Sequence, residues 1–184
     1  MEAQILRAML MFFILPVWLI GGLADYLCHR HSHIETTSGW KESASHILQL
    51  TEMGIPILAL MFFEVNALII ALMLVCLILH EATAWWDVSY AHSTREITPT
   101  EQHVHSFLER LPLMGFLIVI VLYWGQFLAL FGLGSEAARF DLAWKRQPLP
   151  GWYIAGVLIA VVLIAWIPYG EEFLRCWRAE KSRH

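Results

Sequence analysis

Long apolar segments, separated by short polar stretches, set the organisation of this chain. The first runs from Ile5 to Leu23, close to the ~20 residues that a helix needs to cross a bilayer core, and similar segments recur later. The pattern predicts an all-α protein, a polytopic membrane bundle of about five helices in a single domain. The expected helices cover about residues 5–33, 42–63, 66–91, 99–133 and 151–169, and a charged tail covers residues 170–184.

The apolar region over residues 54–79 decides the topology, because it can be one long span or parts of two helices. A single span would hold Glu64 near the bilayer centre, where a charged side chain costs at least about 2.5 kcal/mol. We therefore predict a turn at residues 64–66. This turn brings His46 and His80 to the same membrane face.

Two polar stretches carry signals for helix starts. Thr98 and Glu101 frame a capping box around Pro99, which suits the first position of a helix. Either Thr37 or Ser38 is expected to cap the helix that enters at residue 40.

Composition agrees with a membrane protein and excludes several other classes. Hydrophobic residues make up 58% of the 184 residues, charged residues only 15%, and the mean hydropathy is +0.57. The net charge of −4 argues against a nucleic-acid partner, and three scattered cysteines form neither a disulfide framework nor a Cys-rich zinc module. Under the five-helix topology, eight of the twelve Lys and Arg residues share the side of the histidines, which predicts that this side is cytoplasmic.

Histidine and carboxylate residues provide the candidate chemistry. Eight of the nine histidines lie between residues 29 and 105, and Asp25, His29 and His33 follow an i, i+4, i+8 pattern that forms one helical stripe. Four helices that each present imidazole or carboxylate at one depth are typical of a metal site in a bundle core. The predicted metal ligands are Asp25, His29, His33, His46, His80, Asp87, His92, His103 and His105. Four further residues are expected to orient these ligands by hydrogen bonds without binding the metal themselves: His31, Glu52, Glu81 and Glu101.

The run His29-Arg30-x-x-His33, which follows Asp25 and Tyr26 at the end of an apolar segment, resembles a known motif. It is similar to the first histidine box of the membrane-bound fatty-acid hydroxylase, sterol desaturase and alkane hydroxylase superfamily. The resemblance covers about nine residues, and the HxxHH boxes of that superfamily are absent from this sequence. It implies a non-haem diiron centre with His29 and His33 as ligands, and O2-dependent oxidation of lipid-like substrates.

The number of candidate ligands exceeds the three or four that one zinc ion needs, so the sequence predicts two metal ions. The resemblance implies that these ions are iron rather than zinc, and that the activity is hydroxylation or desaturation of a lipid-like substrate with O2. Electrons must come from a separate donor protein, because the chain contains no flavin, haem-attachment or Fe–S motif. Arg30, Arg95 and Arg110 are candidates to dock an acidic donor.

Three alternatives remain open at this level. A zinc-dependent membrane hydrolase needs about three ligands and an activated water. A b-type haem protein needs two histidines facing each other across the bundle. A divalent-metal carrier needs ligands along a path through the membrane, for which Glu52 and Glu64 are the deeper candidates.

Overall fold

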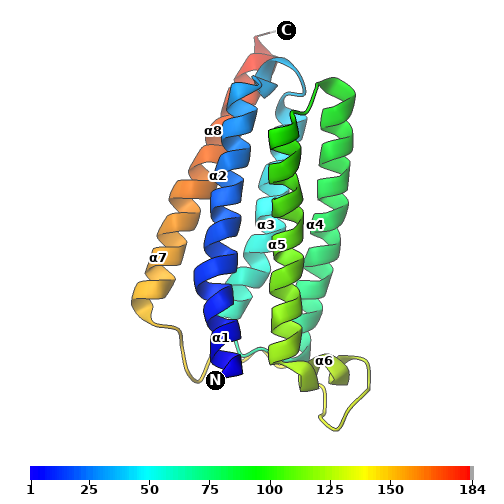
Figure 1. Ribbon diagram of the computed structural model, residues 1–184, viewed down its shortest axis with the longest axis vertical. Helices are drawn as coiled ribbons and strands as arrows, with labels where there is room; N and C mark the ends of the chain where they lie inside the picture. The colour runs from blue at the N-terminus through cyan, green and yellow to red at the C-terminus, as the bar shows by residue number, and fades with distance from the viewer. Residues whose placement is uncertain (183–184) are drawn as a thin grey trace.

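Five long helical segments run side by side in a computed structural model that describes residues 1–182 (Figure 1). Each is long and apolar enough to cross a membrane. The first combines α1 (Glu2–Met9), η1 (Leu10–Ile14) and α2 (Leu15–His31), and the fifth combines α7 (Gly151–Val161), η3 (Val162–Trp166) and α8 (Ile167–Lys181). Between them lie η2 (Ile34–Thr36), α3 (Trp40–Phe62), α4 (Ala67–Thr94), α5 (Pro99–Leu122) and the short α6 (Trp124–Leu130). The predicted all-α bundle is confirmed, and residues 1–182 contain no β-strand.

The turn between α3 and α4 confirms that residues 54–79 belong to two helices. Asn66 caps α4, because its side-chain oxygen accepts a hydrogen bond of 3.2 Å from the amide of Ile69. The Asn66 amide nitrogen also donates to the Asp141 carbonyl at 2.7 Å, which ties the turn to the long loop after α6. Glu64 therefore lies at the end of the bundle, away from its middle.

Several predicted boundaries are wrong, each for a local reason. The first long helix ends at His31, because His33 adopts the left-handed conformation with φ 52° and ψ 52°. The fourth is interrupted at Tyr123, where φ −126° and ψ 38° separate α5 from α6. Gly39, with φ 70°, occupies the cap position of α3, so neither Thr37 nor Ser38 caps it.

The predicted charged tail is also wrong for residues 170–181, because α8 continues the fifth long helix to Lys181. Residues 183 and 184 lie outside the described part of the chain. The helical extension carries two buried residues, Glu172 and Cys176, back to the bundle. A segment that the sequence suggests is solvated is therefore part of the core at this end.

Two π-helical segments interrupt the first and fifth long helices. In both, a proline follows two residues after the π segment: Pro16 after η1 and Pro168 after η3. A proline provides no amide hydrogen to the carbonyl four residues earlier, and a local widening of the helix is a common adjustment. The two segments lie in neighbouring helices, since η3 packs against α2.

The apolar core occupies the half of the bundle that contains the α3–α4 turn. Its most buried members, Ile69, Ile70 and Val119, belong to α4 and α5 and are at most 1% exposed. A second apolar group around Leu19 and Tyr169 joins α2 to the fifth helix. Above these layers, toward the C-terminus in Figure 1, buried residues become polar.

The topology predicts the side from which each loop is accessible. In a variant without the three native cysteines, His33→Cys and His92→Cys should react with a membrane-impermeant thiol reagent from one side. Ser135→Cys, in the loop after α6, should react only from the other side, because α5 separates it from His92. Labelling of positions 33 and 92 from opposite sides would contradict the turn at residues 64–66.

Candidate metal centre

Buried histidine and carboxylate side chains gather at one end of the bundle, from five different helices. We call this set the polar cluster, and its eight members are Asp25, His29, Glu42, His46, Asp87, Glu101, His105 and Glu172. Each is at most 6% exposed. Burial of so many ionisable groups is costly unless they are paired or bind metal.

Three helices each contribute a carboxylate and a histidine at the same spacing. The pairs are Asp25 and His29 on α2, Glu42 and His46 on α3, and Glu101 and His105 on α5. Residues four apart lie on one helix face, so each pair enters the bundle together. This repeated spacing is the sequence signal that identifies Glu42, which the sequence analysis did not include among the site residues.

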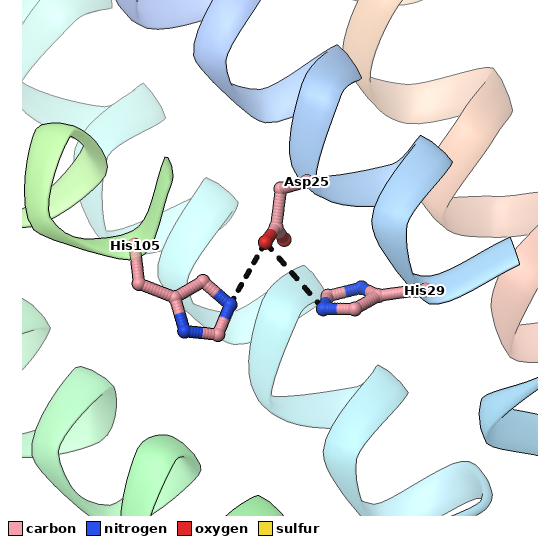
Figure 2. A group of neighbouring side chains, drawn as sticks. All are labelled: Asp25, His29 and His105. Carbon is pink, nitrogen blue, oxygen red and sulfur yellow. Dashed lines mark ion pairs between the residues drawn. The ribbon is translucent and has the colours of Figure 1, made fainter. Parts of the chain in front are cut away.

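One oxygen of Asp25 lies between two imidazoles (Figure 2). Its Oδ1 is 2.8 Å from Nε2 of His105 and 3.4 Å from Nε2 of His29. The other oxygen accepts a hydrogen bond of 3.2 Å from the hydroxyl of Tyr169, which also donates to the Gly22 carbonyl. Tyr169 thus fixes the carboxylate while Oδ1 faces the two histidines.

Glu172, from α8, connects two stacked histidines. The rings of His29 and His46 lie with centroids 4.4 Å apart and planes within 10°. The two oxygens of Glu172 reach Nδ1 of His29 at 3.2 Å and Nδ1 of His46 at 2.9 Å. A carboxylate on one ring nitrogen fixes the tautomer and leaves the other nitrogen for a metal. Both Nε2 atoms remain directed toward the other carboxylates.

Asp87 is the partner of His46 on α4. Its Oδ2 is 3.2 Å from Nε2 of His46, and its Oδ1 accepts a short hydrogen bond from the hydroxyl of Ser45. The Ser45 hydroxyl also contacts the Glu42 carbonyl at 2.6 Å. Asp87 is therefore held from one side and presents its second oxygen to His46.

Arg95 closes the cluster at the end of α4. Its guanidinium donates to both oxygens of Glu42, at 3.2 and 2.5 Å, and to both oxygens of Glu101, one of them at 3.0 Å. Burial lowers the pKa of Arg95, but the hydrogen bonds that it donates to Glu101 and Glu42 outweigh this effect and raise the pKa above its usual value. Arg95 is therefore a buried cation, and the prediction that it docks a donor protein is wrong.

Glu101 differs from its predicted role. The Thr98 hydroxyl accepts a hydrogen bond from the Glu101 amide at 3.2 Å, which confirms the helix cap. The Glu101 carboxylate, however, turns to Arg95 and lies 3.3 Å from Nε2 of His29. Glu101 thus contacts Nε2 of His29 directly, whereas the sequence predicted that it would only orient a ligand residue.

The donor atoms approach closely enough to surround metal ions. One group consists of Asp25, His29 and His105, and a second consists of His29, Glu42 and His46. Within each group, one donor atom from every residue lies within 4.8 Å of the others. The two groups share His29, so the polar cluster provides two adjoining places for a metal.

Charge balance and hydrogen bonding support the fit. Five buried carboxylates face one guanidinium, which leaves four negative charges when the histidines are neutral. Two divalent cations would neutralise them. Several donor atoms are buried and lack a hydrogen bond of good geometry within residues 1–182: Asp25 Oδ1, His29 Nε2, His46 Nε2 and His105 Nε2. Metal coordination would satisfy these atoms.

Three predicted ligands lie away from the cluster. The side chain of His33 is 71% exposed and pairs with Glu35, because the helix that was to carry it ends two residues earlier. His92 and His103 are also exposed, on the outer faces of α4 and α5. The predictions for these three residues as ligands are wrong.

The supporting residues also differ from expectation. His31 and Glu81 are exposed. Glu52 lies further along α3, where its Oε1 accepts a hydrogen bond of 2.9 Å from Thr83 and its Oε2 is buried without a hydrogen bond within residues 1–182. None of these three contacts the polar cluster within the described residues.

His80 occupies the layer below the cluster. It lines a small cavity of about 50 Å³ together with Asp25, His46 and His105. Its ring interacts with the backbone of Leu108, whose carbonyl is freed by Pro112 four residues later in α5. His80 thus faces the cavity with both ring nitrogens buried and without a hydrogen bond of good geometry within residues 1–182, while the predicted contact with the other ligands is not present.

Removal of the Arg95 guanidinium should destabilise the protein strongly. Arg95→Leu leaves Glu42 and Glu101 buried without their cation, and breaking such a pair costs about 3–5 kcal/mol. Chemical unfolding in detergent should show this loss, while Arg110→Leu, at an exposed arginine on α5, should change stability by less than about 0.5 kcal/mol. Equal stability of the two variants would contradict the role of Arg95 as the cation that compensates Glu42 and Glu101.

The chain matches no protein-family model, and neither the curated proteins nor the solved structures provide a match. The structure itself shows a helical membrane protein whose buried histidine and carboxylate groups could hold metal ions.

Proposed function

We propose that the protein is a membrane-bound oxidoreductase that holds two metal ions, preferably iron, and uses O2 to hydroxylate or desaturate a lipid-like substrate. The observation that carries this proposal is the polar cluster itself. Three histidines and five carboxylates converge from five helices, and together with Arg95 their four net negative charges match two divalent cations.

The donor set favours iron among the common metals. Carboxylate and imidazole side chains on facing helices of a bundle are the ligands of diiron and dimanganese centres, and the absence of thiolate disfavours copper(I) and iron–sulfur clusters. Asp25 and His105 would hold one ion and Glu42 and His46 the other, while Nε2 of His29, the ring nitrogen that Glu172 leaves free, would bind one of the two. When bound, such a pair of ions supplies the redox chemistry that activates O2.

The residues around the donors have separate tasks. Glu172 orients His29 and His46 through their Nδ1 atoms, and Tyr169 orients Asp25. Arg95 offsets the charge of Glu42 and Glu101. These contacts keep the ligands in place before metal binds, so little reorganisation accompanies loading.

Apolar space next to the cluster fits a hydrophobic substrate. The small cavity under the cluster is followed by an apolar cavity of about 470 Å³, within the range of sites for organic ligands. Trp18 lines both cavities. A chain in the larger cavity can therefore reach toward the donor atoms without leaving the bundle.

Hydroxylation in this scheme converts a C–H bond, O2, two electrons and two protons into a C–O–H group and one water. Desaturation removes two hydrogens and yields two waters from the same O2, electrons and protons. A reduced electron-transfer protein supplies the electrons. Arg30 and Arg110 are exposed on the side of the cluster, which we propose to be cytoplasmic, and they offer positive charge for docking.

Metal analysis of the purified protein tests the proposal directly. We expect about two iron ions per chain and no Soret band. His29→Ala removes a member of both donor groups and His46→Ala removes a member of one, so each should lose at least one metal ion, whereas His92→Ala should retain both. One zinc ion per chain would favour a hydrolase, and a Soret band would favour a haem protein.

Two neighbouring glutamates allow a matched test of the orienting role. Glu172→Gln removes the carboxylate that contacts Nδ1 of both stacked histidines, so iron affinity should fall about 10- to 100-fold. Glu171→Gln, at the adjacent half-exposed residue that pairs with Arg30, should leave iron affinity unchanged. Competition with a calibrated chelator measures both, and equal affinities would remove Glu172 from the site.

A further inference from the structure

The larger cavity has an apolar body and a charged end. Its body is lined by Leu10, Ile14, Met53, Leu60, Met73 and Phe116, from four of the five long helices. The prolines inside α3 and α5, Pro56 and Pro112, also line it. Its volume is about 470 Å³. The cavity therefore lies in the middle of the bundle, and its apolar lining is suited to a hydrocarbon chain.

Four charged residues line its far end: Arg7, Glu64, Lys145 and Arg146. Glu64 accepts a hydrogen bond of 2.7 Å from the backbone amide of Arg146. The side chains of Arg7 and Lys145 form no salt bridge with any residue of 1–182. Burial lowers the pKa of Lys145, Glu64 opposes this, and Arg7 adds to it. The end of the cavity thus carries excess positive charge.

The opposite end approaches the polar cluster by one helical turn on three helices. On α4, Leu77 lines the larger cavity and His80 the smaller one. The same step separates Met53 from Leu50 on α3 and Leu111 from Leu108 on α5. From Arg7 to Asp25 the helix spans about 27 Å at ~1.5 Å per residue. Cationic groups and the candidate metal centre therefore stand at opposite ends of the two neighbouring cavities, which we together call the apolar path.

We propose that this path binds a single-chain amphiphile with an anionic head group, with the head at Arg7 and Lys145 and the end of the chain toward the polar cluster. The cationic end selects a carboxylate or phosphate over a neutral head, because an uncompensated ammonium and guanidinium gain a charge-assisted partner. The assignment of this amphiphile as substrate rests on the proposed function. It places oxidation toward the end of the chain, remote from the head group.

Equilibrium binding to purified protein in neutral detergent tests the head-group selection. A long-chain fatty acid and the alkyl phosphate of equal length should each bind at least about tenfold more tightly than the matching fatty alcohol. Comparison of the two anions separates a carboxylate from a phosphate ligand. Lys145→Gln and Arg7→Gln should each weaken binding of the preferred anion about tenfold and leave the alcohol unchanged. Arg139→Gln is the control, because Arg139 is exposed in the same loop region and does not line the cavity.

A second pair of variants tests the apolar body of the path. A Cβ at Gly115 would meet the side chains of Ile14 and Leu10 at 3.7 and 3.8 Å, so Gly115→Leu places its larger side chain among cavity-lining residues. Gly156→Leu makes the same change on an exposed face of α7 with open space around it. Fatty-acid binding should be lost only in Gly115→Leu, with thermal unfolding as the check that both variants fold.

Equal binding of acid and alcohol, or unchanged binding in Lys145→Gln and Arg7→Gln, would overturn the proposal. Full binding in a folded Gly115→Leu variant would do the same. All binding is measured on chelator-treated protein, and metal content is measured separately. Fatty-acid binding by a protein that never contains metal would remove the proposed oxidation and retain this site, and an iron-loaded protein without such binding would do the reverse.

Discussion

The structure depends on the burial of five carboxylates at one end of a membrane bundle. Each would be unfavourable there alone, so each has a cationic or hydrogen-bonding partner, and the partners come from different helices. Arg95 ties the end of α4 to α3 and α5, and Glu172 ties α8 to α2 and α3. The requirement for electrostatic compensation thus fixes the relative positions of all five long helices at this end.

Much of the fold could be predicted from the sequence because apolar length and turn chemistry are local properties. The turn at residues 64–66 followed from the cost of a carboxylate in the bilayer, and Asn66 at the cap confirms it. Within the site, residues on regular helix faces, such as Asp25 and His46, could be identified by spacing. His33 could not be placed, because a left-handed residue ends the helix before it, and Glu172 lies in a sequence that resembles a solvated tail.

Polar residues inside the apolar half show how the bundle accommodates irregular backbone. Pro112 frees the carbonyl of Leu108, and the His80 ring lies beside that backbone. Glu52 receives the Thr83 hydroxyl. Neither residue belongs to a group of converging donor atoms, so a buried polar side chain is not by itself a sign of coordination. The convergence of several donor atoms on shared points separates the polar cluster from these isolated groups.

Glu172 follows every other member of the polar cluster in chain order, which determines when the centre can be completed during synthesis. At translation rates of 5–20 residues per second, about 3 to 13 seconds pass between the synthesis of His105 and that of Glu172. During this interval the stacked rings of His29 and His46 lack the carboxylate that fixes their tautomers. Insertion of the last helix therefore adds the carboxylate that orders the two rings, and a metal ion that the polar cluster could hold would find this ordered arrangement only afterwards.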